Sequence, residues 1–399
     1  MARRRRKQPV LAWEGRGTIG AVEVAPPGDA EPPPAGTLFA CDNLGVMQNL
    51  ARRCGACIDL VYIDPPFATR VAHGVRVGEE DALAYDDRWG SLAEYLAFMQ
   101  ARLALMRALL APGGFLFVHC DWRANAYLRV LLDEVFGGDC FRNEIVWRRA
   151  PNLGRQAASK QLGRTADSIF VYGKTPGGAF PGPAPTVRRD LPVSRRGTPV
   201  GAQWDARAGR WFTTAPRGDY TEESVARLER EGRIHRTASG TVYVKYWVEE
   251  ERGAFFRRQP VDTIWDDEEV RPLRFAGKRE LAVEYVTQKP ESLLRRIIAW
   301  ASPPGGLVAD FFCGSGTTPV VAHALGRRWI ACDAGDLAVR ATTKRLRDAG
   351  AAVSLVPAGE AGAPAAHVAA VPRITRRKAS KSETAREAGP RTRVQGVEP

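Results

Sequence analysis

An acid, two prolines and an aromatic residue follow directly on an apolar run early in the chain. Residues 58–63 (IDLVYI) have the length and β-branched content of a buried strand, and Asp64-Pro65-Pro66-Phe67 comes next. Each proline fixes its own φ and biases the preceding residue toward extended geometry, so the loop should leave the strand as a stiff elbow. Such an elbow can hold a carboxylate, a backbone carbonyl and an aromatic face around a planar ligand. A solvated acid in a Pro-rich turn is the alternative interpretation.

A second segment that could do chemistry lies about 250 residues later, again after an apolar strand-like run. It covers residues 310–319 (DFFCGSGTTP). Gly314 and Gly316 allow a tight turn that approaches a ligand closely, and Thr317 or the threonine after it should cap the following helix. The dinucleotide fingerprint would need a small residue where Pro319 stands, so a pyrophosphate site is disfavoured. A P-loop is excluded because GxxxxGK[ST] occurs nowhere in the chain.

An acid follows the next predicted strand, at residues 329–332. Asp333 lies 19 positions after Gly314. An acid in this place can accept hydrogen bonds from ribose hydroxyls. The glycine turn and the acid together favour a nucleoside-type ligand without a pyrophosphate.

The net charge of +13 indicates a polyanionic partner, but most of it lies at the two ends of the chain. Residues 3–7 are five consecutive basic residues, and residues 371–399 contain eight basic residues and three glutamates. The rest of the chain is only weakly basic. We therefore interpret residues 1–36 and 358–399 as disordered basic segments that bind polyanions without reading sequence.

The seven cysteines and the absence of a secretory apolar segment favour a reduced, cytoplasmic setting close to the nucleoid. No apolar stretch approaches the roughly 18 residues of a membrane span, so no membrane contact is expected. Cys54 and Cys57 form a CxxC pair, but a structural zinc site needs four ligands and no second pair is suitably spaced. No metal is expected.

Helical and strand patterns alternate along most of the chain, which predicts an α/β fold with a doubly wound, mostly parallel sheet. The clearest helix spans residues 91–110, where Ser91 and Glu94 form a capping box. Between about 174 and 275 the rhythm changes to Gly, Pro, Trp and Arg, and only a helix at 221–231 and a hairpin across Ser239-Gly240 can be placed. We interpret residues 174–275 as an insert that divides the α/β domain into residues 37–173 and 276–357.

The motifs in this order resemble the β class of S-adenosylmethionine-dependent DNA amino-methyltransferases, which includes type III modification subunits and many solitary adenine methyltransferases. In that family [DNS]PP[YFW] precedes the recognition region and FxGxG comes last, the same circularly permuted order as here. Residues 41–43 (CDN) and 287–290 (TQKP) also resemble family cofactor segments. The resemblance covers about residues 37–345. It implies a seven-stranded Rossmann-like sheet, S-adenosyl-L-methionine as cofactor, an inserted DNA-recognition region and double-stranded DNA as substrate.

The resemblance also assigns roles to individual residues. Asp64 and the carbonyl of Pro65 would accept the two amino hydrogens of the target base, and Phe67 would stack on that base after it flips out of the duplex. An Asp at position 64, rather than a Ser, favours adenine N6 over cytosine N4. The implied catalytic residues are Asp64, Pro65, Pro66 and Phe67. The implied cofactor-binding residues are Asp42, Asn43, Lys289, Asp310, Phe312, Gly314, Ser315, Gly316, Thr317 and Asp333.

Several of these roles have a plainer alternative. Asp42, expected at the adenine edge, could be only a helix N-cap. Lys289, expected to pair with the carboxylate of the methionine moiety, could be a surface lysine at a helix start. Asp310 could serve only to anchor the turn. The arginines at positions 148, 149, 155, 257, 258, 271 and 274 are candidates for DNA contacts. A second copy of the chain and a separate restriction endonuclease are the other partners considered, and a DNA-binding subunit without turnover is the remaining alternative function.

Overall fold

The computed structural model describes residues 34–67, 89–150, 162–272 and 288–357, the backbone of residues 72–77 and 80–86, and short stretches between 11 and 26. Most of the basic N-terminal segment and the whole tail at 358–399 lie outside the described residues. Thr287, Arg155 and Arg274, which the sequence analysis singled out, lie outside them as well. No helix in the described part of the chain is long and apolar enough to cross a membrane.

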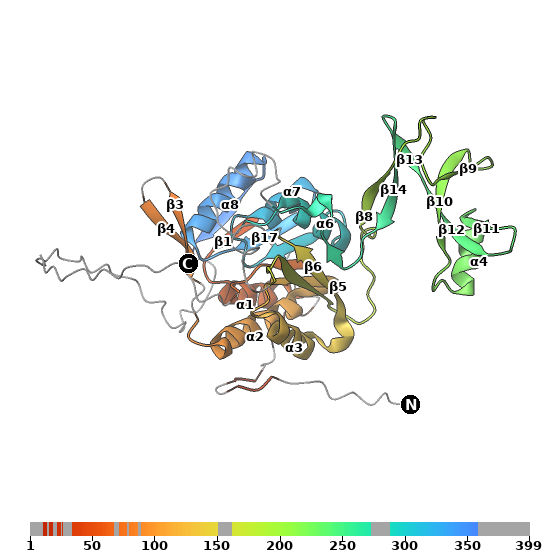
Figure 1. Ribbon diagram of the computed structural model, residues 1–399. Coiled ribbons are helices and arrows are strands. Elements are labelled where there is room, and N and C mark those ends of the chain that lie inside the picture. The colour runs from red at the N-terminus through yellow and green to blue at the C-terminus, as the bar shows by residue number, and fades with distance from the viewer. Residues whose placement is uncertain are drawn as a thin grey trace, which may run out of the picture. The chain divides into compact units, whose positions relative to one another are not determined.

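One mixed sheet forms the centre of the fold, with the strand order β15-β6-β7-β5-β2-β16-β17-β1-β18 (Figure 1). β7 runs antiparallel to β5 and β6, and the other neighbouring strands are parallel. The strands from β6 to β1 make up the seven-stranded sheet that the sequence predicted, and β15 and β18 are short additions at its edges. The bounds are β1 Thr37–Ala40, β2 Ile58–Ile63, β5 Leu110–Cys120, β6 Phe141–Arg148, β7 Ala166–Gly173, β15 Ile264–Trp265, β16 Leu307–Asp310, β17 Arg328–Cys332 and β18 Ser354–Pro357.

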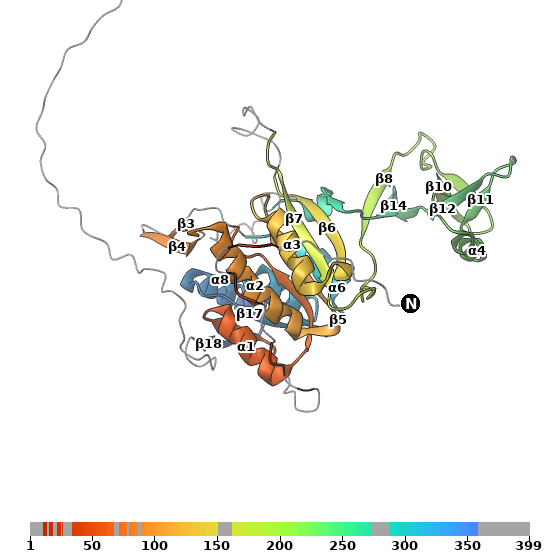
Figure 2. The same ribbon diagram turned by 90° about the horizontal axis from the view of Figure 1, so that it is seen from below.

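Helices cover both faces of this sheet (Figures 1 and 2). On one face lie α1 Asn43–Cys54, α2 Leu92–Leu109 and α3 Asn125–Phe136; on the other lie α6 Glu291–Ala301, α7 Thr317–Ala324 and α8 Asp336–Asp348. Because successive strand residues point to opposite faces, β2 supplies Val61 and Ile63 to the first apolar cluster and Leu60 and Tyr62 to the second. The doubly wound architecture is thereby confirmed.

The capping box of α2 forms with a shift of one residue. Ser91 Oγ accepts from the Glu94 N–H at 3.1 Å, as predicted. The Glu94 carboxylate, however, accepts from the N–H of Gly90 at 3.1 Å. Two N–H groups at the start of the helix are satisfied in this way, which fixes where α2 begins behind the elbow.

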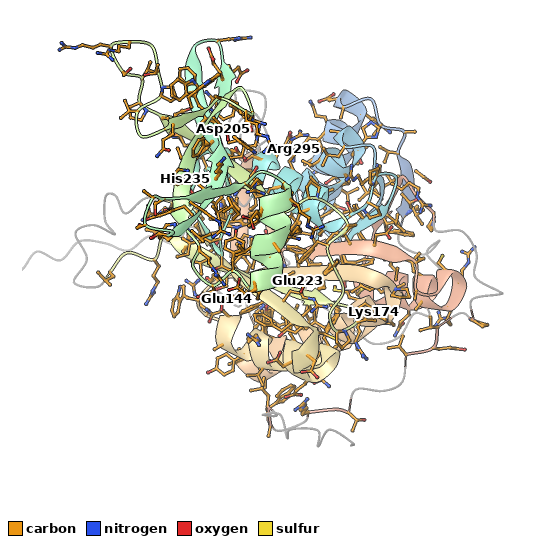
Figure 3. The ribbon with its side chains drawn as sticks, turned by 90° about the vertical axis from the view of Figure 1, so that its right-hand side faces the viewer. Glu144, Lys174, Asp205, Glu223, His235 and Arg295 are labelled. Carbon is orange, nitrogen blue, oxygen red and sulfur yellow. The ribbon has the colours of Figure 1, made fainter. Side chains whose placement is uncertain are left out.

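The insert contains far more regular structure than the sequence predicted. A three-stranded sheet consists of β8 Thr186–Leu191, β13 Glu249–Glu251 and β14 Ala254–Pro260. A four-stranded sheet consists of β9 Gln203–Asp205, β10 Arg210–Pro216, β11 Ile234–Arg236 and β12 Val242–Trp247, accompanied by α4 Glu222–Arg230. The predicted helix and the hairpin between β11 and β12 are confirmed, and the sequence analysis could not place the other strands. Figure 3 labels Asp205, Glu223 and His235 on these elements.

Both ends of the predicted insert belong to the main sheet and its packing. The N–H of Lys174 donates to Gly114 O, and the N–H of Gly182 donates to Trp300 O. At the other end β15 pairs with β6, and Trp265 is buried in the core between the sheet and α6. The separate sheets therefore span residues 186–260, a shorter stretch than 174–275. A further hairpin, β3 Ala72–Val77 with β4 Glu80–Asp86, follows the elbow and was also missed.

Candidate active site

The two predicted motifs follow neighbouring strands at the centre of the sheet. β2 and β16 pair in parallel, with Leu60 opposite Val308. The chain continues from β2 toward β5 and from β16 toward β17, so the strand order reverses between the two strands. Doubly wound sheets bind ligands outside the carboxyl ends of the strands at such a reversal. Asp64 and the glycine turn, far apart in sequence, both start from this point.

The turn after β16 adopts the conformation that its glycines allow. Gly314 has φ +51° and Gly316 has φ +78°, both in the left-handed region. The N–H of Gly314 donates to Asp333 Oδ2 at 2.9 Å, and Asp333 Oδ1 accepts from the N–H of Gly335 at 2.9 Å. Gly316 is the N-cap of α7 and no side chain caps the helix, so the prediction that a threonine caps it was wrong.

Asp310 holds the turn from the inside. Its buried carboxylate accepts from the N–H of Phe312 at 3.0 Å and from the hydroxyl of Thr318 at 2.5 Å. Burial raises the pKa of Asp310 to about 7, and the charges of Asp64 and Asp333 add to the shift. Since both carboxylate oxygens are used within the turn, the structure favours the anchoring role for Asp310.

Helix α8 supplies two residues that the sequence analysis missed. Thr342 Oγ1 donates to Gly314 O at 2.9 Å, and Arg345 donates to Ser315 O at 2.9 Å and to Thr317 Oγ1 at 3.0 Å. These contacts hold the outer side of the glycine turn. The signal that could have found them was weak, because α8 is polar along most of its length and offers little apolar periodicity.

Asp64 leaves one carboxylate oxygen without a partner. Lys289 Nζ contacts Asp64 Oδ2, and the backbone oxygen of Lys289 accepts from Thr317 Oγ1 at 3.1 Å. Asp64 Oδ1 is buried and accepts no hydrogen bond within the described part of the chain. A buried acceptor without a donor costs free energy, which a ligand N–H would recover. Lys289, predicted to bind the cofactor, thus contacts the predicted catalytic acid.

A buried polar network lies behind Phe67. Its ring stacks on His119, with ring centroids 5.9 Å apart and an interplanar angle of 26°. His119 Nδ1 lies 3.0 Å from the Tyr62 hydroxyl, and Nε2 lies 3.2 Å from Asp167 Oδ2. Arg149 Nε donates to Asp167 Oδ1 at 2.8 Å. Burial alone would raise the pKa of Asp167, but the hydrogen bond from His119 and the charges of His119 and Arg149 lower it below its ordinary value.

If Phe67 stacks on a target base, as the resemblance implies, the variant His119→Ala should slow methyl transfer by about 100-fold, since a displaced stacking ring misplaces that base by about 1 Å or more. Single-turnover rates at saturating DNA and cofactor measure this effect. Tyr62→Phe is the matched control, because it keeps the ring and removes only the hydroxyl. A normal single-turnover rate in a folded His119→Ala protein would show that Phe67 is positioned by other contacts.

Asp42 and Asn43 begin α1 next to the glycine turn. Asp42 Oδ1 accepts from a backbone N–H in the first turn at 2.8 Å, and Oδ2 pairs with Arg102 at 2.8 Å. Asn43 donates to Phe311 O at 2.7 Å and accepts from Arg102 Nε at 2.6 Å. The helix-cap role of Asp42 is therefore present, and Asn43 ties α1 to the turn. Phe312, the next residue after Phe311, packs against a phenylalanine of α2, with the two ring centroids 6.0 Å apart.

A family model described as DNA methylase matches residues 58–344 of this chain. The chain belongs to this DNA methylase family. The match covers more than half of the chain and includes both motifs, and it confirms the resemblance to the amino-methyltransferases. In the described part of this DNA methylase, no three His, Cys, Asp or Glu side chains gather in a way that could hold a metal ion.

Curated relatives include a type II methyltransferase and a subunit of a type III restriction-modification enzyme. The type II methyltransferase M.EcaI of Enterobacter cloacae is 29% identical over 319 residues, which is 75% of this DNA methylase and 66% of the relative. The type III StyLTI Mod subunit of Salmonella typhimurium is 27% identical over 330 residues, which is 71% of this chain and 48% of the subunit. The chain thus spans just under two thirds of the first relative and about half of the second.

Solved structures with a similar arrangement include a putative DNA modification methylase from Thermus thermophilus, determined with S-adenosyl-L-methionine. It is 17% identical with a TM-score of 0.43, and the alignment covers 80% of this DNA methylase and 98% of that chain. The cytosine-N4-specific PvuII DNA methyltransferase is 14% identical with a TM-score of 0.42, and the alignment covers 81% of this DNA methylase and 97% of the PvuII chain.

Proposed function

We propose that this DNA methylase transfers a methyl group from S-adenosyl-L-methionine to the N6 amino group of adenine in double-stranded DNA. The observation that carries the proposal is Asp64. It presents a buried carboxylate oxygen, without a hydrogen-bond partner among the described residues, at the carboxyl end of β2 beside the strand that leads into the glycine turn. An amino group is the ligand that such an acceptor suits.

The residues around Asp64 divide the work of the reaction. Asp64 Oδ1 and the carbonyl of Pro65 accept the two amino hydrogens, which draws the nitrogen lone pair out of conjugation with the base. Lys289 Nζ contacts the other carboxylate oxygen of Asp64 and so holds the side chain in place. Phe67, held by His119, stacks on the flipped base. These groups stand in place before the reaction, so they favour the transition state without reorganising.

The glycine turn has the features that a sulfonium nucleoside needs. When bound, S-adenosyl-L-methionine supplies an electrophilic methyl group. Gly314 and Gly316 place backbone rather than side chains beside the ligand. Asp333 anchors Gly314 through its carboxylate, which is the group expected to accept from a ribose hydroxyl. Asp42, Asn43 and Phe312 flank the same turn from α1 and the β16 loop.

Adenine N6 is the first candidate because residue 64 is an aspartate. Cytosine N4 is the second, since the same two acceptors would serve its amino group equally well. The test is to incubate the chain with mixed-sequence duplex DNA and S-adenosyl-L-methionine, digest the DNA to nucleosides and analyse them by mass spectrometry. We expect N6-methyladenine. N4-methylcytosine alone would select the second candidate. The absence of both methylated nucleosides would overturn the proposal.

The name of the StyLTI Mod subunit places that protein in a type III restriction-modification enzyme, and we propose a restriction-modification context for this chain. A separate restriction endonuclease, a second copy of the chain and a cytoplasmic location stay predictions.

We also propose that the insert contacts DNA through one face of its three-stranded sheet. The register of β8 and β14 places Arg189 opposite Arg257 on one face and Arg188 opposite Arg258 on the other. Like charges directly opposite each other destabilise a sheet unless a counter-charge is present. The face of Arg188 has its counter-charges in three acids of the same small sheet (Asp190, Glu249 and Glu251). Arg189 and Arg257 form no ion pair with an acid among the described residues.

Replacing Arg189 and Arg257 together by Gln should raise the KM for DNA about tenfold or more. It should also lower the salt slope of DNA binding by about 2, since two phosphate contacts are lost. The control replaces Arg188 and Arg258, and we expect a change of less than about twofold because acids already neutralise that face. Equal effects of the two double variants would contradict the assignment of the DNA-binding face.

A further inference from the structure

An exposed tryptophan and an arginine meet at the edge of the sheet where Asp64 lies. Trp122 follows the carboxyl end of β5 by two residues, and it is 44% exposed. Arg164 precedes β7 by two residues, and β7 runs antiparallel beside β5, so both residues lie at the same edge. The guanidinium carbon of Arg164 lies 3.7 Å from the centroid of the Trp122 ring, and that of Arg123 lies 4.9 Å from it.

The charge of this region is only partly neutralised. Arg123 contacts Asp121, and Arg149 pairs with Asp167. Arg164 and Arg148 are exposed, and neither forms an ion pair with an acid in the described part of the chain. Stacking on a ring fixes a guanidinium without removing its charge. We call Trp122, Arg123, Arg148, Arg149 and Arg164 the Trp122 cluster.

The sequence around the cluster is depleted of acids as well. Between Ile145 and Ala166 there are five basic residues and no Asp or Glu. This run joins β6 to β7 at the same edge of the sheet. In a body of low net charge, the exposed arginines Arg148 and Arg164, which form no ion pair among the described residues, indicate an anionic partner.

The strand order places the cluster on a definite side of the site. Along β17-β16-β2-β5-β7-β6, the glycine turn comes first, then Asp64, then Trp122, then Arg164 and Arg149. The cluster therefore lies on the side of Asp64 away from the cofactor turn. Neighbouring strands are about 4.8 Å apart, so Trp122 is roughly one strand and Arg164 roughly two strands from the acid. The sugar-phosphate backbone of a nucleotide whose base is bound at Asp64 lies within one to two strand spacings of the acid, where the cluster is.

We propose that the Trp122 cluster binds the phosphates of the DNA strand that carries the target base, directly beside the flipped nucleotide. This inference rests on the proposed function. Arg164 and Arg148 donate to phosphate oxygens, and Arg164 does so from a fixed position because the Trp122 ring supports it. Arg149 links the cluster through Asp167 and His119 to the ring of Phe67.

The test compares Arg164→Gln and Trp122→Ala in the full chain, with Arg52→Gln on exposed α1 as the charge-matched control. Fluorescence anisotropy with a labelled duplex gives the Kd for DNA at several salt concentrations. We expect each variant to weaken DNA binding about tenfold and Arg164→Gln to lower the salt slope by about 1. The double variant should lose little more than either single one, since both remove the same contact. Arg164→Lys should recover part of the affinity, because it keeps the charge.

Two readouts separate a DNA contact from a structural defect. The affinity for S-adenosyl-L-methionine and the kcat at saturating DNA should stay within about twofold of wild type in both variants. An unchanged DNA Kd and salt slope in Arg164→Gln, or a loss no greater than that of Arg52→Gln, would overturn the inference. If the wild-type chain binds DNA but methylates nothing, the proposed function fails, and the DNA-binding comparison still tests the surface.

Discussion

The variant Asp64→Ala should lower kcat by at least about 10²–10³-fold while the affinity for S-adenosyl-L-methionine stays within a few-fold. Asp64 Oδ1 is a buried acceptor without a hydrogen-bond partner among the described residues, so the variant removes the group that we propose holds the amino nitrogen in line with the methyl donor. Tritium transfer from labelled cofactor to duplex DNA measures the rate, and calorimetry measures cofactor affinity.

A second acid of the same strand provides the control. Asp59 Oδ2 accepts from the N–H of Leu307 at 2.7 Å, which ties β2 to β16. Asp59→Asn keeps an oxygen for that bond, so it should leave turnover near normal. Normal turnover in Asp64→Ala would refute the catalytic assignment. Loss of cofactor binding in the same variant would mean that Asp64 maintains the glycine turn through Lys289 and Thr317.

The variant Gly316→Ala should reduce cofactor affinity by about 100-fold or more. Gly316 has φ +78°, where a side chain adds about 1–2 kcal/mol of strain. A Cβ at this position would also lie 2.6 Å from Thr342 Oγ1 and 2.7 Å from Thr342 Cγ2. The turn or α8 must move to relieve the clash, and the contacts from α8 to Gly314 and Ser315 hold the turn in place.

Gly113→Ala is the matched control for this prediction. A Cβ at Gly113 would meet nothing within 4 Å, and its φ is not positive. Both variants should be compared by calorimetric titration with S-adenosyl-L-methionine and by thermal melting. Wild-type affinity in Gly316→Ala would show that the turn tolerates a side chain and that the glycine is not needed for ligand approach.

The sequence predicted those parts of the fold that depend on local patterns. Apolar runs of strand length gave the central strands, and the prolines and glycines that follow them gave the two motifs. Asp64 and the glycine turn meet because β2 and β16 are parallel neighbours whose carboxyl ends lie side by side. The strands of the insert were missed because they are short and largely polar, so their alternation is weak.

The contacts within the site could not be predicted in the same way. Lys289 and Asp64 are 225 positions apart, and no local pattern indicates that they touch. Arg102 donates hydrogen bonds to both Asp42 and Asn43 from a mostly apolar helix. An arginine among apolar helix residues is the sequence signal that could have indicated this buried contact. His119 is tolerated in an apolar strand for a similar reason. Both of its ring nitrogens have a hydrogen-bond partner, and an aromatic ring stacks on its face.

The pairing of β2 with β16 has a consequence for how the chain folds during its synthesis. β2 is the middle strand of the sheet, yet about 240 residues separate it from its partner β16 in the chain. During translation, β2 waits with one edge unpaired until the insert has been made, and contacts of such long range form slowly. A ribosome-bound fragment that stops before Leu307 already carries the acid and the aromatic ring of the elbow. It lacks β16 and the glycine turn, so we expect such a fragment to bind no cofactor.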